Sequence, residues 1–266
     1  MTPEAAAAEA ALLDAAEQSA TQIRQSTEVH PDLTIDDAYA IQAAWQQIKL
    51  DRGEVLVGHK IGLTSRAMQA AMNITTPDSG FLTSAMVFEP ESELITASFC
   101  DPKLEIELAF VLGEDLSGTD LTVDDVLDAT NYVTPAVELI AARSFRRDPT
   151  TGRTRTVIDT ISDNAANAGI IMGDVQVSAR DVDLRWVSAL GARNDVIEET
   201  GVAAGVLGHP ARGIVWLARR YHEQGLTLAA GQVILAGSFT RPIDIRAGDD
   251  FHFDYGPLGA FDVSFT

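Results

Sequence analysis

The stretch from Lys103 to Gly113 constrains the fold of this chain more than any other segment, because its side chains alternate in character. Every second position is apolar: Leu104, Ile106, Leu108 and Phe110. A period of two is that of a β-strand, whose successive side chains point to opposite faces. Glu105 and Glu107 therefore share one face, roughly 6.5 Å apart at a rise of about 3.3 Å per residue. The segment predicts a strand with two acids on one face.

Two interpretations of this pair of acids are open. Carboxylates flanked by aliphatic core residues raise each other's pKa and cost stability unless a cation or hydrogen-bond donors lie between them. Residues 131–140 predict another strand, and its Glu138 would supply a third oxygen ligand. Three carboxylates form a hard site suited to Mg²⁺ or Mn²⁺, with open positions for water and substrate. The alternative is a solvated strand face, which on the motif alone is the commoner case.

The predicted elements divide the chain into a helical beginning and a β-rich remainder. Residues 1–52 predict helices, with start signals at Thr2-Pro3 and at Thr34. From Val55 the hydrophobic period changes to two, which indicates strands. Strands are predicted around residues 56–63, 131–140, 181–190, 196–199, 233–236 and 251–265, and helices after Ser65, after Thr122 and over residues 210–223.

This order predicts one domain of the α+β class, dominated by β-structure. Residues 1–52 would form a helical N-terminal layer, and residues 53–266 a β-rich catalytic core. We find no internal repeat and no low-complexity linker that would favour two independent domains.

The charge balance excludes several classes of partner. Thirty-nine acidic against 19 basic residues give a net charge of −20, which repels nucleic acid and anionic lipid alike. No apolar run reaches the roughly 20 residues that span a bilayer, and the first residues lack the basic start of a signal peptide, so we expect a cytoplasmic protein without membrane partners. The single cysteine, Cys100, excludes an internal disulfide and a cysteine-rich zinc site.

Lys60 is the second candidate for chemistry. It is one of three lysines and lies in the apolar, glycine-flanked segment 58–63. A partly buried ammonium needs a carboxylate partner, and Asp78, in the predicted turn 77–80, is a candidate. Such a pair near a bound substrate can move protons in general acid and base steps. A purely structural ion pair explains the two residues slightly better on sequence alone.

Three further segments offer polar groups for a substrate. Residues 143–155 form a basic loop with Arg143 and Arg155 among its five arginines, which would attract an acidic ligand. Ser162 opens a run of small polar residues, for which helix capping is the commoner use. Residues 237–242, with Thr240, follow an apolar strand, and their hydroxyls and backbone N–H groups would suit a carboxylate. A tight turn explains this last segment nearly as well.

The combination of these motifs is more specific than any one of them. In order they read GHKIGLTS (58–65), PDSG (77–80), LEIELAFVL (104–112), PAVELI (135–140), DTISDNAANAG (159–169), EETGVAAGVL (198–207) and GSFTRP (237–242). Together they resemble the 2-oxo-4-enoate hydratase and 4-oxalocrotonate decarboxylase branch of the fumarylacetoacetate hydrolase superfamily, over nearly the whole chain. The turn at 77–80 departs from the family pattern, because Ser79 replaces an aromatic residue.

The resemblance implies a β-rich fold around a Mg²⁺ or Mn²⁺ ion on Glu105, Glu107 and Glu138, with Lys60 and Asp78 as acid and base. The implied reaction adds water to a 2-oxo-4-enoate diacid, 2-oxo-hept-4-ene-1,7-dioate, in the homoprotocatechuate meta-cleavage pathway. We expect Ser162, Thr240, Arg143 and Arg155 to bind this small 2-oxo dicarboxylic acid, with an arginine on its distal carboxylate. The resemblance also implies a homo-oligomer, with a decamer of two pentamers as one form, and allows a partner enzyme of the same pathway.

Other reactions remain open on sequence. A 4-oxalocrotonate-type decarboxylase would use the same metal and the same electron sink. An acylpyruvate C–C hydrolase is less favoured, because that branch resembles a design with a histidine and glutamate on a mobile segment. Residues 64–84, where that segment would fall, contain no histidine.

Overall fold

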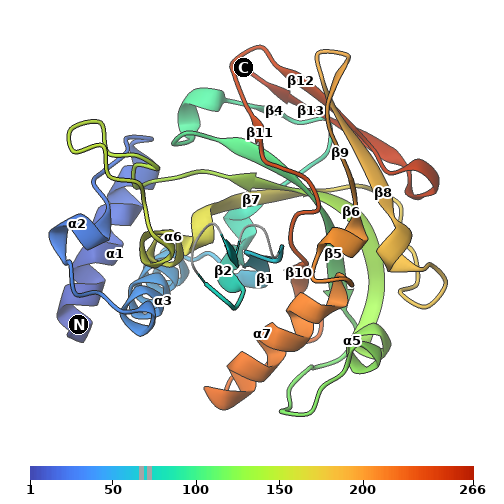
Figure 1. Cartoon of the computed structure of the whole chain (residues 1–266), viewed down its shortest axis with the longest axis horizontal. Coiled ribbons are helices and arrows are strands. Elements are labelled where there is room, and N and C mark those ends of the chain that lie inside the picture. Colours follow the sequence, from blue (N-terminus) through green and yellow to red (C-terminus); the bar gives the residue numbers. More distant parts are fainter. Residues whose placement is uncertain (66–68, 71–73) are drawn as a thin grey trace.

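The computed structural model describes residues 1–65, 69–70 and 74–266, and its helices flank two β-sheets (Figure 1). The helices are α1 (Pro3–Gln18), α2 (Ser26–Val29), α3 (Ile35–Asp51), α5 (Val123–Ala129), α6 (Val157–Ser162) and α7 (Ala211–Glu223). The strands are β1 (Leu56–Gly62), β2 (Asp78–Thr83), β3 (Val87–Phe88), β4 (Glu93–Leu94), β5 (Lys103–Leu112), β6 (Thr130–Ile140), β7 (Asn167–Met172), β8 (Ser188–Arg193), β9 (Val196–Val202), β10 (Val233–Leu235), β11 (Ile243–Asp244), β12 (Asp250–Asp254) and β13 (Ala260–Phe265).

Side-chain caps fix where the helices begin. The Thr34 and Thr122 side chains each accept a hydrogen bond from the backbone N–H three residues ahead, and the aspartate at that position accepts one from the threonine N–H, so α3 and α5 both start with a capping box. Thr2 caps α1 with proline at the next position, as predicted. The same box at Thr156 begins α6, a helix whose start the sequence analysis did not predict.

The larger sheet carries the strands that matter for chemistry. Its order is β2-β1-β10-β5-β6-β7-β3, with β11 also paired to β5, and the long antiparallel pair β5–β6 lies at its centre. The smaller sheet has the order β4-β13-β12-β8-β9. Aromatic residues of β12 and β13 pack against β5 in one core, and α1 and α3 bury Leu13, Ile41 and Trp45 against the other face of the larger sheet (Figure 1).

The predicted α+β class with a helical N-terminal layer is confirmed, and three local predictions are wrong. Asp78 does not lie in a turn: it begins β2 and pairs with Gly62 of β1. The strand predicted over residues 181–190 starts only at Ser188, after a 3₁₀ turn. Strand β7 was not predicted, because its residues follow a polar segment typical of a cap. The helix predicted after Ser65 falls mainly on residues 66–68 and 71–73, outside the described residues.

Within the described ranges, none of the helices combines the length and the apolar character that crossing a bilayer requires.

Candidate metal centre and proton-transfer pair

The β5–β6 register brings three glutamates together. Glu105 lies directly opposite Glu138 in the antiparallel ladder, and Glu107 lies two residues further along β5 on the same face. One carboxylate oxygen from each residue lies within 4.8 Å of the other two. Cross-strand pairing thus converts the E-x-E alternation into a cluster of three acids, which is the arrangement predicted from sequence.

The electrostatics of this cluster favour a bound cation. Glu107 and Glu138 are fully buried, and in the part of the chain that the structure describes Glu107 Oε1 and Glu138 Oε2 have no hydrogen-bond partner. Loss of hydration and the charge of Glu138 raise the pKa of Glu105 to about 7 and that of Glu107 well above its ordinary value. A divalent cation would satisfy the orphaned oxygens and remove the repulsion. The donor set, oxygen only, fits Mg²⁺ or Mn²⁺.

Hydrogen bonds from Gly237 and Tyr255 hold Glu107 and its strand in place. The Gly237 N–H donates to Glu107 Oε2 at 2.8 Å, which leaves Oε1 for a ligand. The Tyr255 hydroxyl donates to the Glu107 carbonyl oxygen at 3.1 Å and also bonds to the carbonyl of Ala136, so it ties β5 to β6 beside the site.

Lys60 and Asp78 lie next to the three glutamates. Lys60 Nζ is 3.3 Å from Glu138 Oε1, and both Lys60 and Asp78 are buried. Gly62 makes this approach possible: a Cβ on Gly62 would lie 2.2 Å from Asp78 Oδ1 and 3.1 Å from Lys60 Nζ. Any other residue at position 62 would therefore collide with Asp78 and Lys60, which explains why a glycine lies two positions after Lys60 in the sequence.

The charges of this pair are set by its neighbours. Burial lowers the pKa of Lys60, but the carboxylates of Glu138 and Asp78, with those of the other two glutamates, outweigh burial and hold the pKa above its ordinary value. Burial raises the pKa of Asp78, although the Lys60 charge opposes this. Asp78 Oδ1 has no hydrogen-bond partner within residues 1–65, 69–70 and 74–266. The arrangement therefore offers one charged donor and one free carboxylate acceptor.

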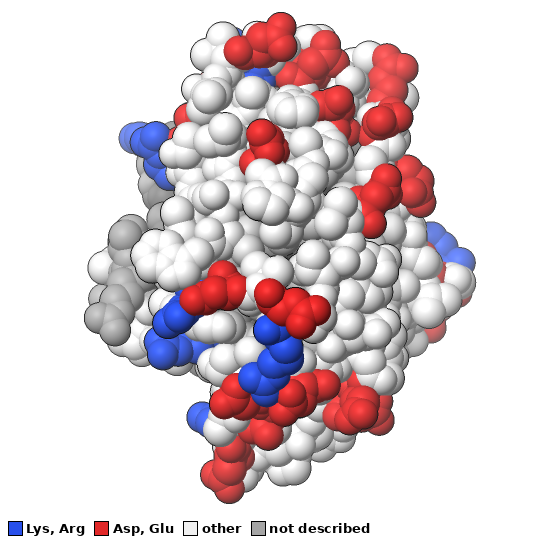
Figure 2. Space-filling model, turned by 90° about the vertical axis from the view of Figure 1, so that its right-hand side faces the viewer, with Lys and Arg blue, Asp and Glu red and all other residues white. Residues whose placement is uncertain are grey.

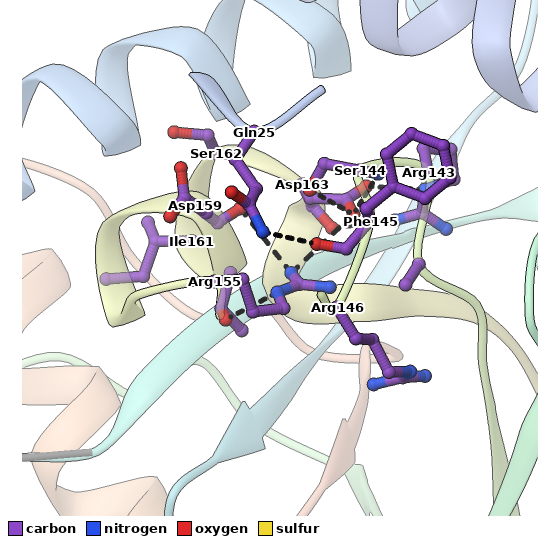
Figure 3. A network of polar contacts seen from close by, with 12 residues as sticks. Gln25, Arg143, Ser144, Phe145, Arg146, Arg155, Asp159, Ile161, Ser162 and Asp163 are labelled. Atoms are coloured by element: carbon purple, nitrogen blue, oxygen red, sulfur yellow. Dashed lines mark hydrogen bonds and ion pairs between the residues drawn. The ribbon is translucent and has the colours of Figure 1, made fainter. Parts of the chain in front are cut away.

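The two arginines that we expected to bind substrate differ in their contacts (Figure 3). Arg143 donates from Nε to Asp163 Oδ1 at 2.6 Å, and its other two nitrogens donate to the carbonyls of Asn167 and Asp163. Arg155 donates from Nε to Thr160 Oγ1 at 3.0 Å, whereas its buried Nη1 finds no partner among the residues that the structure describes. These contacts favour a structural role for Arg143 and leave Arg155 with a free donor.

The remaining predicted residues lie close to backbone partners. Ser162 is fully buried and donates to the carbonyl of Ile158 within α6. Thr240 lies on the segment that runs beside β5 and is partly exposed, with its N–H bonded to Ser238 Oγ at 3.3 Å. His59, on the other face of β1 from Lys60, is buried and within 3.0 Å of the Tyr221 hydroxyl, and burial lowers its pKa to about 4.

Sequence reasoning missed Asn167, a second side chain beside Lys60 that contacts Glu138 directly. Asn167 Nδ2 donates to Glu138 Oε1 at 2.8 Å. Asn164, three residues earlier, pairs its side-chain amide with the backbone N–H and carbonyl of Phe81 on β2. The asparagine-rich run 163–167 was the available signal, but capping was the simpler interpretation of it.

Comparisons with known proteins show which proteins this chain is similar to. The fumarylacetoacetate (FAA) hydrolase C-terminal family matches residues 24–265. The 2-oxo-hept-4-ene-1,7-dioate hydratase of Escherichia coli is 53% identical over 254 residues, which are 96% of this chain and 95% of that protein. A 2-keto-4-pentenoate hydratase of Paraburkholderia xenovorans is 34% identical over 100% of this chain and 96% of its own length. The solved structure of 4-oxalocrotonate decarboxylase from Pseudomonas putida G7, complexed with magnesium and adipate, superposes with a TM-score of 0.94 at 32% identity and covers 100% of this chain and 99% of that one.

Proposed function

The chain belongs to the fumarylacetoacetate hydrolase family, and on that premise we propose that it is a divalent-metal-dependent hydratase of 2-oxo-hept-4-ene-1,7-dioate. The product would be 4-hydroxy-2-oxoheptane-1,7-dioate, formed in the meta-cleavage degradation of homoprotocatechuate in the cytoplasm. One observation carries the proposal: three carboxylates converge within 4.8 Å beside a buried lysine and aspartate. The relative at 53% identity supports the hydratase reaction.

Glu105, Glu107 and Glu138 would hold Mg²⁺ or Mn²⁺. When bound, such a cation supplies a Lewis acid that polarises the 2-oxo group of the substrate. Among relatives, the decarboxylase that binds magnesium together with adipate, a diacid, supports this choice of metal and of substrate class.

Lys60 and Asp78 are the acid and the base of this proposal. The Lys60 ammonium is kept charged by the surrounding carboxylates, so it can donate a hydrogen bond or a proton to an oxygen that gains negative charge. Asp78 has a raised pKa and a free Oδ1, so it can accept the proton that the incoming water loses when its oxygen bonds to C4. Before this addition, the double bond moves from C4–C5 to C3–C4, because C3 loses one proton and C5 gains one. The addition to this conjugated form then places the hydroxyl on C4 and a proton on C3, the carbon next to the 2-oxo group.

A direct assay separates this function from its nearest rival. Purified protein with Mg²⁺ and the 2-hydroxy-dienoate diacid should consume the dienoate absorbance without releasing CO₂. The close superposition on a decarboxylase makes decarboxylation the second candidate, and stoichiometric CO₂ would establish it. No consumption with any of Mg²⁺, Mn²⁺ or Ca²⁺ would refute both.

Replacement of Arg155 by alanine should impair recognition of the distal carboxylate. Its Nη1 is buried and has no hydrogen-bond partner among the described residues, and its charge counteracts the rise that burial causes in the pKa of Asp78. Because hydrogen bonds to charged groups contribute about 1.5–3 kcal/mol, we expect KM for the diacid to rise roughly 10- to 100-fold, with a much smaller change for a monoacid dienoate.

Two variants of the same loop serve as controls. Arg147→Ala, at an exposed position, should change neither KM. Arg143→Ala should lower the melting temperature, because it removes the cation 2.6 Å from buried Asp163 and leaves only the longer ion pair with Arg155, at 3.6 Å. Equal KM changes for diacid and monoacid in Arg155→Ala would contradict the assignment.

We further propose that the protein self-associates through the outer face of β8 and β9, defined by Leu190, Ile197 and Val202. These side chains are exposed, as is Trp186 at 73%. β8 lies on the right of Figure 1, and on that side, shown in Figure 2, neutral residues fill the centre and most acidic residues lie toward the edges. β9 is also an edge strand. A decamer of two pentamers remains the expectation from sequence.

Ile197→Asp should therefore reduce the molar mass measured by light scattering after gel filtration, because the charge would be buried in the contact. Glu198→Gln on the same strand is the control, since it adds no charge. A parent protein that elutes as a monomer at micromolar concentration would contradict the proposal.

A further inference from the structure

Asn167 reaches Glu138 only because the β6–β7 ladder contains a bulge. Glu138 pairs with Ile170 and Leu139 with Gly169, so a regular ladder would pair Ile140 with Ala168. Instead Ile140 pairs with Asn167, and one extra residue is inserted in β7. Since side chains alternate between faces, this shift turns Asn167 to the face that carries Glu138.

The chain before Asn167 is strained. Asn164, Ala165 and Ala166 have φ values of 52°, 50° and 62°, three successive non-glycine residues in the left-handed region. Each costs roughly 1–2 kcal/mol, so surrounding contacts must hold the turn. The Asn164 amide does so through Phe81, and Gly80 makes room for it, because a Cβ there would lie 2.5 Å from the Asn164 carbonyl oxygen. Arg143 Nη1 then binds the Asn167 carbonyl at 2.9 Å.

The contacts of Asn167 divide the oxygens of Glu138. Asn167 Nδ2 and Lys60 Nζ both approach Oε1, at 2.8 and 3.3 Å, whereas Oε2 is buried without a partner. The amide orientation follows from chemistry, because the reversed amide would set two oxygens against each other. Asn167 Oδ1 is left as a buried acceptor without a hydrogen-bond partner in the described parts of the chain, a state that costs about 1–3 kcal/mol.

We infer that Asn167 is a positioning residue of this site. Its Nδ2 fixes Glu138 so that Oε2 is directed to the cation, and its Oδ1 accepts a hydrogen bond from an O–H of the bound ligand. That O–H belongs either to the water that is added or to the enol hydroxyl of the substrate. The first half of this inference, the role of Nδ2, concerns metal binding alone. Only the second half, the role of Oδ1, rests on the proposed function.

The first half is tested without substrate. We expect metal-free Asn167→Ala and Asn167→Leu to bind Mn²⁺ roughly 10- to 100-fold more weakly than the parent in calorimetric titrations, as is typical when a partner of a metal ligand is removed. Leucine retains the side-chain volume if alanine perturbs folding, and circular dichroism reports the fold. Asn131→Ala, an exposed asparagine on β6, is the matched control. Unchanged Mn²⁺ affinity in both Asn167 variants would overturn the inference.

The second half is tested at saturating Mn²⁺ by two rates. One is hydration of the dienoate, and the other is deuterium exchange at C3 of a saturated 2-oxo diacid in D₂O, which requires enolisation but no water addition. If Oδ1 holds the added water, hydration falls and exchange persists; if it holds the enol hydroxyl, both fall. Parent-like hydration in Asn167→Leu would overturn the role of Oδ1, and a parent without hydration would instead refute the proposed function while leaving the Mn²⁺ result valid.

Discussion

Exchange of Glu107 for glutamine is expected to abolish divalent-metal binding and turnover together while it raises the stability of the metal-free protein. The amide keeps the shape of the side chain and can accept the Gly237 N–H hydrogen bond, but it supplies no charge to a cation. We expect Mn²⁺ affinity to fall at least 100-fold and hydration to fall below detection, because a cation held by two of three carboxylates has lost one of its charged ligands.

The gain in stability has a separate cause. Glu107 is fully buried beside Glu105 and Glu138, and burial together with these charges raises its pKa, which means that the folded state disfavours its ionised form. Glutamine removes that penalty at neutral pH, so the metal-free variant should melt several degrees higher than the metal-free parent, about 1–2 kcal/mol in stability.

Scanning calorimetry and Mn²⁺ titration measure the two effects, with Glu93→Gln as the control because this glutamate is exposed on β4. A Glu107→Gln protein that binds Mn²⁺ like the parent would show that the cation site lies elsewhere. A lower melting point without metal would show that the buried carboxylate makes favourable contacts beyond its bond to Gly237.

The shared face of Glu105 and Glu107 could be predicted from sequence, because the alternation of side chains along a strand is a local property. Glu105 and Glu107 had to share a face once residues 103–113 formed a strand. Their meeting with Glu138 depends on the β5–β6 register, which no local pattern specifies, and the prediction of three ligands drew on the family resemblance. Capped helix starts such as those at Thr34 and Thr122 were equally local and were predicted for the same reason.

The features that the sequence analysis does not predict depend on contacts between residues far apart in the chain. The left-handed turn at 164–166 is held by an Asn164 bond to Phe81, a residue 83 positions away, and short-range propensity disfavours such a turn. Asp78 was assigned to a turn because Pro77 and Gly80 flank it, yet pairing with β1 makes it the first residue of a strand. In both cases tertiary pairing overrides the local signal, and both cases lie at the site.

Exchange of Lys60 for methionine should have the opposite effect on stability to the Glu107 exchange. Methionine keeps most of the side-chain volume but removes the ammonium 3.3 Å from Glu138 Oε1. Four neighbouring carboxylates raise the pKa of Lys60, so its loss leaves them without this compensating charge, and breaking a buried pair costs about 3–5 kcal/mol. We therefore expect the metal-free variant to melt clearly below the parent, and saturating Mn²⁺ to recover much of the loss.

Turnover of Lys60→Met should fall roughly 10²- to 10⁴-fold even at saturating Mn²⁺, the range typical for loss of a general acid or base, whereas Mn²⁺ affinity should stay the same or increase. Lys49→Met is a matched control, because both lysines are 4% exposed and Lys49 pairs with Glu17 away from the site. Lys49→Met should have a lower melting temperature than the parent, a difference that Mn²⁺ does not remove, and its hydration rate should equal that of the parent. If Mn²⁺ stabilises the two variants equally, Lys60 does not neutralise the carboxylates that bind the cation, and the charge balance proposed for this centre is wrong.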